Sequence, residues 1–142
     1  MKKTRGKGAF SFLITFLVCT LCTGAVIYLV DGVPLYGLPD AEDIVLVRLT
    51  DLQHPDKTVE LERKEDIQNA RNVANVLRFR LGQAEDRAMA YQIDYHLQNG
   101  KTVTLTAGEG AVAWGGAIYP VKKDGKLFVN VVEGLFFYQG EK

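Results

Sequence analysis

The first 30 residues divide into a charged start and an apolar run. Residues 1–8 carry four cations and no acid, whereas residues 9–30 carry no charged side chain. At about 1.5 Å per residue, a helix of these 22 residues is about 33 Å long, which is enough to cross the roughly 30 Å hydrocarbon core of a bilayer. The pattern therefore predicts a basic tail at 1–8 and a transmembrane helix at 9–30 that anchors the chain in the lipid bilayer.

The same run leaves a second interpretation open. Thr23, Gly24 and Ala25 are small enough for a signal-peptidase site, in which case residues 1–25 are removed. The apolar run continues past that site to Val30, which favours an uncleaved anchor. For an anchor, the cations keep the N-terminus in the cytoplasm, so the rest of the chain is expected outside the cell membrane.

Beyond residue 30 the pattern changes to short alternating segments. Residues 31–41 are rich in proline and glycine and predict a linker, so the extracytoplasmic domain is expected at 42–142. Apolar and polar residues alternate in 91–97 and again in 101–106, and Asn99-Gly100 between them is typical of a hairpin turn. Further strands are expected at 42–50, 58–62, 111–114 and 117–121, the first of them buried on both faces because residues 44–47 are all apolar.

One segment has helical periodicity instead. Between Lys64 and Leu81 the apolar residues recur on one face, acids occupy the first turn, arginines occupy the last, and Gly82 supplies a stop. The segment from Leu127 to Tyr138 fits either a last strand or a short helix opened by a capping box of Asn130 and Glu133. The order β-β-α-β-β-β-β predicts an α+β domain, with one helix packed on a mostly antiparallel sheet.

Composition and charge restrict the chemistry of the outer domain. The whole chain has net charge 0, but the part from Asp31 onward has 13 Lys and Arg against 17 Asp and Glu, a net charge of −4. A nucleic-acid partner is therefore not expected. Ser11, Cys19 and Cys22 are the only serine and cysteines, and all lie in the apolar run. Serine and cysteine nucleophile mechanisms are thus excluded in the outer domain.

Two sets of residues are candidates for a ligand site. Asp94 and His96 are two positions apart in a predicted strand, so both point to its solvent face, as an acid–base or metal-binding pair requires. On the polar stripe of the predicted helix, Arg71 and Arg78 could hold an anion. Phe79 on that stripe either contacts the C-terminal segment or is an exposed partner site. Neither set is a complete catalytic or metal site, and no cofactor is expected.

Residues 108–113 match the dinucleotide pattern G-x-G-x-x-A. That motif needs a helix inside a parallel β-α-β unit. Here the preceding strand belongs to a hairpin, and Gly115-Gly116 would break the helix. We therefore expect a turn between strands at this position.

Three features occur together in this order: the D-I-x-x-V strand at residues 43–47, the central helix, and the Y-x-I-x-Y-x-L-x-N-G-K-x-V-x-L hairpin at residues 91–105. Together with the basic tail and the absence of disulfides, this arrangement resembles the small uncharacterised extracytoplasmic domains of Gram-positive single-pass membrane proteins. The resemblance covers about residues 42–121. It implies a location and an α+β fold, and it transfers no functional residue.

These observations favour binding over catalysis. The first hypothesis is a membrane-anchored domain that binds an unknown ligand, either another membrane protein or a cell-wall component. The alternative is a secreted or membrane-tethered hydrolase of the carboxylate or metal type that uses Asp94 and His96.

Overall fold

The computed structural model describes residues 6–85 and 88–140. The chain divides into two compact units, and the boundary in the sequence lies between Gly32 and Val33. The first unit contains one helix, α1 (Gly6–Asp31), which from Gly8 onward is long and apolar enough to cross a membrane. Its threonine hydroxyls donate to the carbonyl four residues earlier at 2.8–3.0 Å, at Thr15, Thr20 and Thr23. These polar groups are therefore satisfied within the helix, as a hydrocarbon environment requires.

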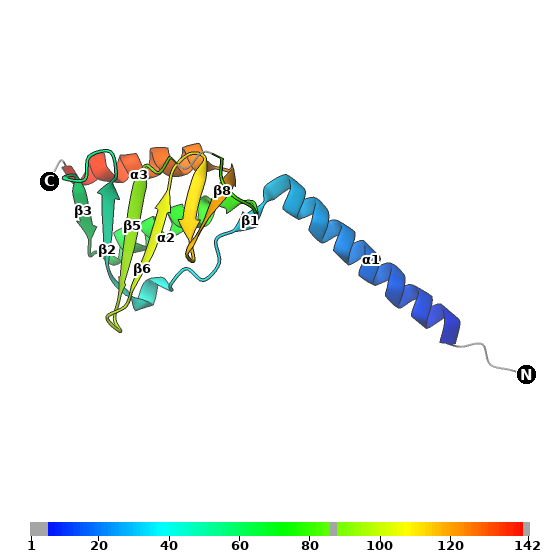
Figure 1. Ribbon diagram of the computed structural model, residues 1–142. Helices are drawn as coiled ribbons and strands as arrows, with labels where there is room; N and C mark the ends of the chain where they lie inside the picture. The colour runs from blue at the N-terminus through cyan, green and yellow to red at the C-terminus, as the bar shows by residue number, and fades with distance from the viewer. Residues whose placement is uncertain (1–5, 86–87, 141–142) are drawn as a thin grey trace, which may run out of the picture. The chain divides into compact units, whose positions relative to one another are not determined.

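The second unit is an α+β domain built on an eight-stranded antiparallel sheet (Figure 1). The strand order is β1-β4-β8-β7-β6-β5-β2-β3, so the predicted fold class is confirmed. The elements of this unit are β1 (Val33–Pro34), the 3-10 turn η1 (Ala41–Asp43), β2 (Ile44–Asp51), β3 (Thr58–Leu61), α2 (Lys64–Val76), β4 (Arg78–Phe79), β5 (Tyr91–Leu97), β6 (Thr102–Ala107), β7 (Ala111–Trp114), β8 (Ala117–Lys123) and α3 (Gly125–Gly140).

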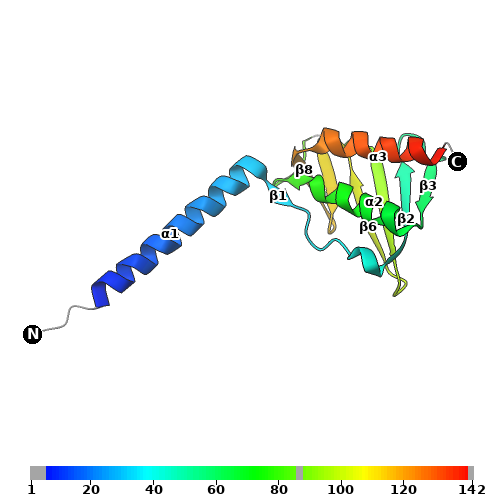
Figure 2. The same cartoon turned by 180° about the vertical axis from the view of Figure 1, so that it is seen from behind.

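Both helices of this unit cover the same face of the sheet, and the opposite face is left open (Figures 1 and 2). Because successive side chains of a strand point to opposite faces, every second residue of the central strands is buried beneath the helices. The buried core consists mainly of Val47, Leu49, Ile93, Tyr95 and Leu105 from the sheet, Ile67, Ala70 and Val73 from α2, and Phe128 and Val132 from α3.

The sequence predicted that the apolar run at the start of β2 would be buried on both faces, but only one face of this segment is buried. The pairing of β2 with β5 shifts register between Ile44 and Leu46, which marks a bulge. The extra residue, Val45, is exposed at this point. Val45 and the half-buried Leu46 therefore follow one another between the buried Ile44 and Val47. The run is apolar throughout, although the strand has only one buried face.

The helix predicted at Lys64–Leu81 is shorter in the structure. α2 ends at Val76, Leu77 is extended, and the next two residues form β4 between β1 and β8. Phe79 is 1% exposed and its ring lies 4.7 Å from that of Tyr119. Pairing with the sheet and burial of this aromatic ring outweigh the weak helical preference of the segment. Leu81, predicted on the buried face, is exposed.

The C-terminal segment is a helix, one of the two interpretations left open by the sequence, but it begins before the predicted capping box. α3 starts at Gly125, directly after Asp124, whose φ is +65°. A Cβ atom at Gly125 would overlap the carbonyl oxygen of Glu109. The close approach of the β6–β7 turn therefore requires glycine here, and Asn130 lies inside the helix rather than at its cap.

Residues 33–43, here called the strap, are packed against the domain instead of forming the predicted linker. β1 pairs with β4 at the edge of the sheet, and Leu35 is only 6% exposed. Side chains of the domain donate to strap carbonyls in three places, with Trp114 Nε1 bonded to Tyr36 O at 2.9 Å, Arg71 Nε to Pro39 O at 2.8 Å, and Gln98 Nε2 to Glu42 O at 2.7 Å. The compact unit therefore begins at Val33 rather than at residue 42.

Candidate functional site

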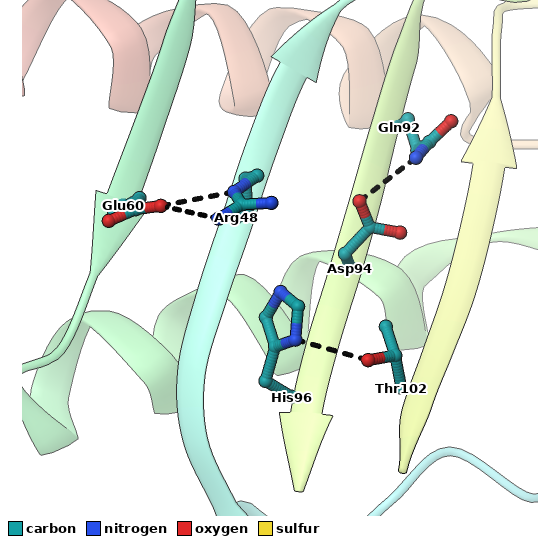
Figure 3. A network of polar contacts seen from close by, with 6 residues as sticks. All are labelled: Arg48, Glu60, Gln92, Asp94, His96 and Thr102. Atoms are coloured by element: carbon teal, nitrogen blue, oxygen red, sulfur yellow. Dashed lines mark hydrogen bonds and ion pairs between the residues drawn. The ribbon is translucent and has the colours of Figure 1, made fainter. Parts of the chain in front are cut away.

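A row of polar side chains crosses four neighbouring strands on the open face of the sheet (Figure 3). Strand pairing sets Glu60 of β3 beside Arg48 of β2, Arg48 beside Asp94 of β5, and Asp94 beside Thr104 of β6. We call these four residues the open-face row. The charges of Glu60, Arg48 and Asp94 alternate along it, and all four side chains point away from the helices.

Short polar contacts join two pairs of neighbours in the open-face row, Arg48 with Glu60 and Asp94 with Thr104. Arg48 donates from Nε and Nη2 to Oε1 of Glu60, at 3.0 and 2.8 Å. Asp94 accepts from Gln92 Nε2 at 2.9 Å and from Thr104 Oγ1 at 2.6 Å. The Arg48–Glu60 pair is about half exposed to solvent, so it stabilises the fold by less than about 1 kcal/mol and can exchange its partners for those of a ligand.

His96 lies beside the open-face row on β5 and is less well satisfied. Its Nδ1 is 3.1 Å from Thr102 Oγ1, and its cross-strand neighbour on β2 is Leu46. Its Nε2 is buried and has no hydrogen-bond partner within the described part of the chain. A buried polar atom without a partner typically costs about 1–3 kcal/mol, so fold stability does not account for a histidine at this position.

The structure places Asp94 and His96 on the same face of one strand, as the sequence pattern predicted (Figure 3). They are held by different partners, Asp94 by Gln92 and Thr104 and His96 by Thr102. Within residues 6–85 and 88–140, three or more His, Cys, Asp or Glu side chains do not gather into a group that could hold a metal ion. The arrangement is suited to hydrogen bonding and charge pairing with a polar surface.

The other predicted site residues lie elsewhere and serve the fold. Arg71 donates to the strap, at Pro39 O. Arg78 Nη1 donates to the carbonyl of Asn75 at 3.0 Å and thereby covers the open C-terminal end of α2. Phe79 is buried between the rings of Tyr36 and Tyr119, so it contacts the domain, but through the strap and β8 rather than the C-terminal segment.

Sequence reasoning missed the partners of Asp94 in the open-face row. Arg48 and Glu60 belong to strands that were predicted, but a row across strands depends on their order and register. A usable signal was present in β6, where Thr102, Thr104 and Thr106 alternate with apolar residues and mark a polar face.

The glycine-rich pattern at residues 108–113 forms a turn, as expected. Gly108 N donates to Ala111 O at 2.9 Å, and β7 begins directly afterwards. A Cβ atom at Gly108 would overlap the carbonyl oxygen of Ala88. The close approach of another segment accounts for this glycine without a bound phosphate.

Comparison of the chain with protein-family models, with curated proteins and with solved structures finds no match. The open face is therefore interpreted from its own geometry.

Proposed function

We propose that this protein is a membrane-anchored, extracytoplasmic interaction domain that binds a cell-envelope partner through the open face of its sheet. One observation carries the proposal. Both helices lie on one side of the sheet, and the opposite side presents an ordered row of charged and hydrogen-bonding groups. Because Glu60, Arg48 and Asp94 alternate in sign, the expected partner surface is polar and carries charges of both signs. Another membrane protein or a cell-wall component would fit.

The first unit supports the anchoring part of the proposal. α1 has the length and composition of a single membrane span. The four cations in residues 1–8, directly before the uncharged run at 9–30, favour a short N-terminus in the cytoplasm. The proposed location is a bacterial cell membrane, crossed once, with the α+β domain outside.

The stiffness of the open face supports its role in binding. Threonine is β-branched and has restricted side-chain rotation, and three threonines stand at alternate positions of β6. Binding through such side chains loses little conformational entropy. When a partner covers the Arg48–Glu60 pair, water is removed and its hydrogen bonds become stronger than they are in solvent.

Site-specific photo-cross-linking in intact cells tests this proposal. A photoreactive residue at Thr104, on the open face, should form a defined adduct with one partner. The matched control is the same residue at Asn72, which is exposed on α2 on the other side of the domain. Equal adducts from both positions, or none from Thr104, would reject the open face as the binding surface.

A charge exchange separates binding from folding. The double variant Arg48→Glu with Glu60→Arg retains an ion pair between β2 and β3 but reverses the order of the charges. We expect only a small fall in melting temperature, because the carboxylate introduced at position 48 stands beside Asp94, and loss of the adduct from Thr104. Retention of the adduct would show that the charges of the open-face row do not select the partner.

The alternative function, a carboxylate or metal hydrolase using Asp94 and His96, stays a prediction. Metal analysis of the purified full chain tests it, because a stoichiometric metal that is lost in both Asp94→Ala and His96→Ala would favour the hydrolase over the interaction domain.

A further inference from the structure

A groove lies beside α3, away from the open-face row. It has a volume of about 480 Å³ and is bounded by the chain that follows β2 on one side and by the C-terminal half of α3 on the other. This size is within the range of sites for small molecules, about 300–1,000 Å³. None of its lining residues belongs to the open-face row, so the inference that follows goes beyond the proposed function and does not rest on it.

One wall of the groove is aromatic. The rings of Tyr91 and Phe136 lie with their centroids 5.6 Å apart and their planes tilted by 31°. Phe137, on the next position of α3, lines the same groove and is 72% exposed. A large aromatic side chain so exposed beside a cavity offers its ring face to whatever enters.

The polar side of the groove is acidic. Asp51, Asp56 and Glu133 line it together with a single cation, Lys57. Asp51 is already occupied, since it accepts hydrogen bonds from the backbone of Gln53 and from the imidazole of His54. Asp56 and Glu133 form no ion pair with any residue that the structure describes, and their charges are therefore available.

Two of the carboxylates that line this groove act on the phenol of Tyr91. Burial raises the pKa of its phenol, and the carboxylates of Glu133 and Asp51 raise it further. The hydroxyl therefore remains protonated and neutral at physiological pH, and the potential around it is negative. A negative potential beside low-dielectric aromatic walls favours a cation and repels an anion.

The number of ligating side chains that lie close together decides which kind of cation fits. A bare metal ion needs several oxygen ligands within about 2.6 Å. Along the described chain, including this groove, three or more acidic or histidine side chains are not close enough together to provide them. A larger cation, with its charge at one end and apolar atoms at the other, can use separated carboxylates and aromatic faces at the same time.

We infer that this groove binds a small organic ammonium ion, with the cationic nitrogen facing Glu133 and Asp56 and the apolar stem lying against Phe136 and Phe137. The carboxylates supply attraction for the charge, and the aromatic rings supply apolar contact and cation–π attraction. The ligand class is thus an alkylammonium compound small enough to enter a groove of about 480 Å³.

Titration of the full chain in maltoside micelles with butylammonium tests the inference. Tyrosines labelled with ¹³C at Cζ report on the groove, and a Tyr91→Phe variant assigns the resonance of Tyr91. We expect a saturable shift of that resonance with butylammonium and none with n-butanol, which has the same stem and no charge. A saturable shift with both compounds, or with neither, would overturn the inference.

Two exposed substitutions locate the binding. Glu133→Gln should weaken butylammonium binding about three- to tenfold, the effect of removing one partly screened charge. Phe137→Ala should also weaken it, and because that ring is largely exposed, the fold should be retained. The matched control Glu65→Gln, in the first turn of α2, should bind as the unmodified chain does. Unchanged affinity in Glu133→Gln, with an unchanged melting temperature, would place the cation elsewhere.

Discussion

His96 is the residue of the open face whose surroundings favour a role beyond stability. Its Nε2 is buried without a hydrogen-bond partner within residues 6–85 and 88–140. Valine suits a strand and has no polar atom to bury, so His96→Val should leave the free energy of unfolding unchanged or raise it by about 1 kcal/mol. Unfolding in denaturant measures this change. A loss of stability in the variant would mean that the imidazole serves the fold.

Tyr95 represents the opposite case, a polar side chain that the core fully encloses. Its hydroxyl donates to Ala70 O at 3.3 Å, and that carbonyl lies inside α2, where the helix also uses it. Tyr95→Phe should therefore lower the free energy of unfolding by no more than about 1 kcal/mol. Tyr95→Ala should lower it by about 3–5 kcal/mol, because a cavity replaces the ring. Comparable losses in the two variants would contradict this assignment.

Asp51 makes the free energy of unfolding depend on pH in the acidic range. Burial acts to raise its pKa, but hydrogen bonds from the His54 side chain and from the backbone of Gln53 and His54 outweigh it, so the pKa lies below the usual 3.8. A carboxyl whose pKa is lower in the folded state contributes stability at neutral pH, and this is lost as the pH falls through the folded value. Asp51→Asn should therefore destabilise the protein more at about pH 7 than at about pH 3. Thermal unfolding at both pH values checks this, and an equal difference at both would contradict it.

At the scale of elements, the strap is the feature that the sequence pattern did not reveal. Leu35 is 6% exposed, so Leu35→Ala should lower the free energy of unfolding by about 2–4 kcal/mol, although it lies in a segment rich in proline and glycine. Its neighbour Tyr36 is 66% exposed, and Tyr36→Ala should cost less than about 1 kcal/mol. Denaturant unfolding of the two variants compares them, and equal effects would mean that the strap is not part of the core.

Elements with a clear period were predictable, and elements fixed only by tertiary contacts were not. The hairpin of β5 and β6 was expected, because alternation and an Asn-Gly turn specify it locally. β1 and β4 span two residues each, too few to carry any period. Their formation depends on pairing between segments far apart in the chain, and the helical pattern that continued to Leu81 concealed it.

The part of the candidate site that lies on one strand was predictable, and the part that depends on strand pairing was not. Asp94 and His96 share a face because they are two residues apart on one strand, which depends on sequence spacing alone. Arg48 joins Asp94 only through the register of β2 and β5. A row across strands is therefore found once the strand order is known.

At the scale of the whole molecule, the proposed orientation predicts how the protein is labelled in cells. Asn69 is exposed on α2, so an Asn69→Cys variant should react with a membrane-impermeant maleimide added to intact cells. The chain without the added cysteine is the control, because Cys19 and Cys22 lie within the apolar helix and should not meet the reagent. Labelling that appears only after the cells are opened would reverse the orientation.

The strap also determines what proteolysis would release. A cut after Ala25, or anywhere before Val33, would free a domain that keeps its edge strand. A cut between Pro34 and Ala41 would separate β1 from the domain, leave β4 as an unpaired sheet edge and uncover Phe79. With α1 as the proposed anchor, shedding from the membrane would thus yield either a folded, diffusible molecule or an aggregation-prone fragment, and a shift of a few residues in the cleavage site decides between them.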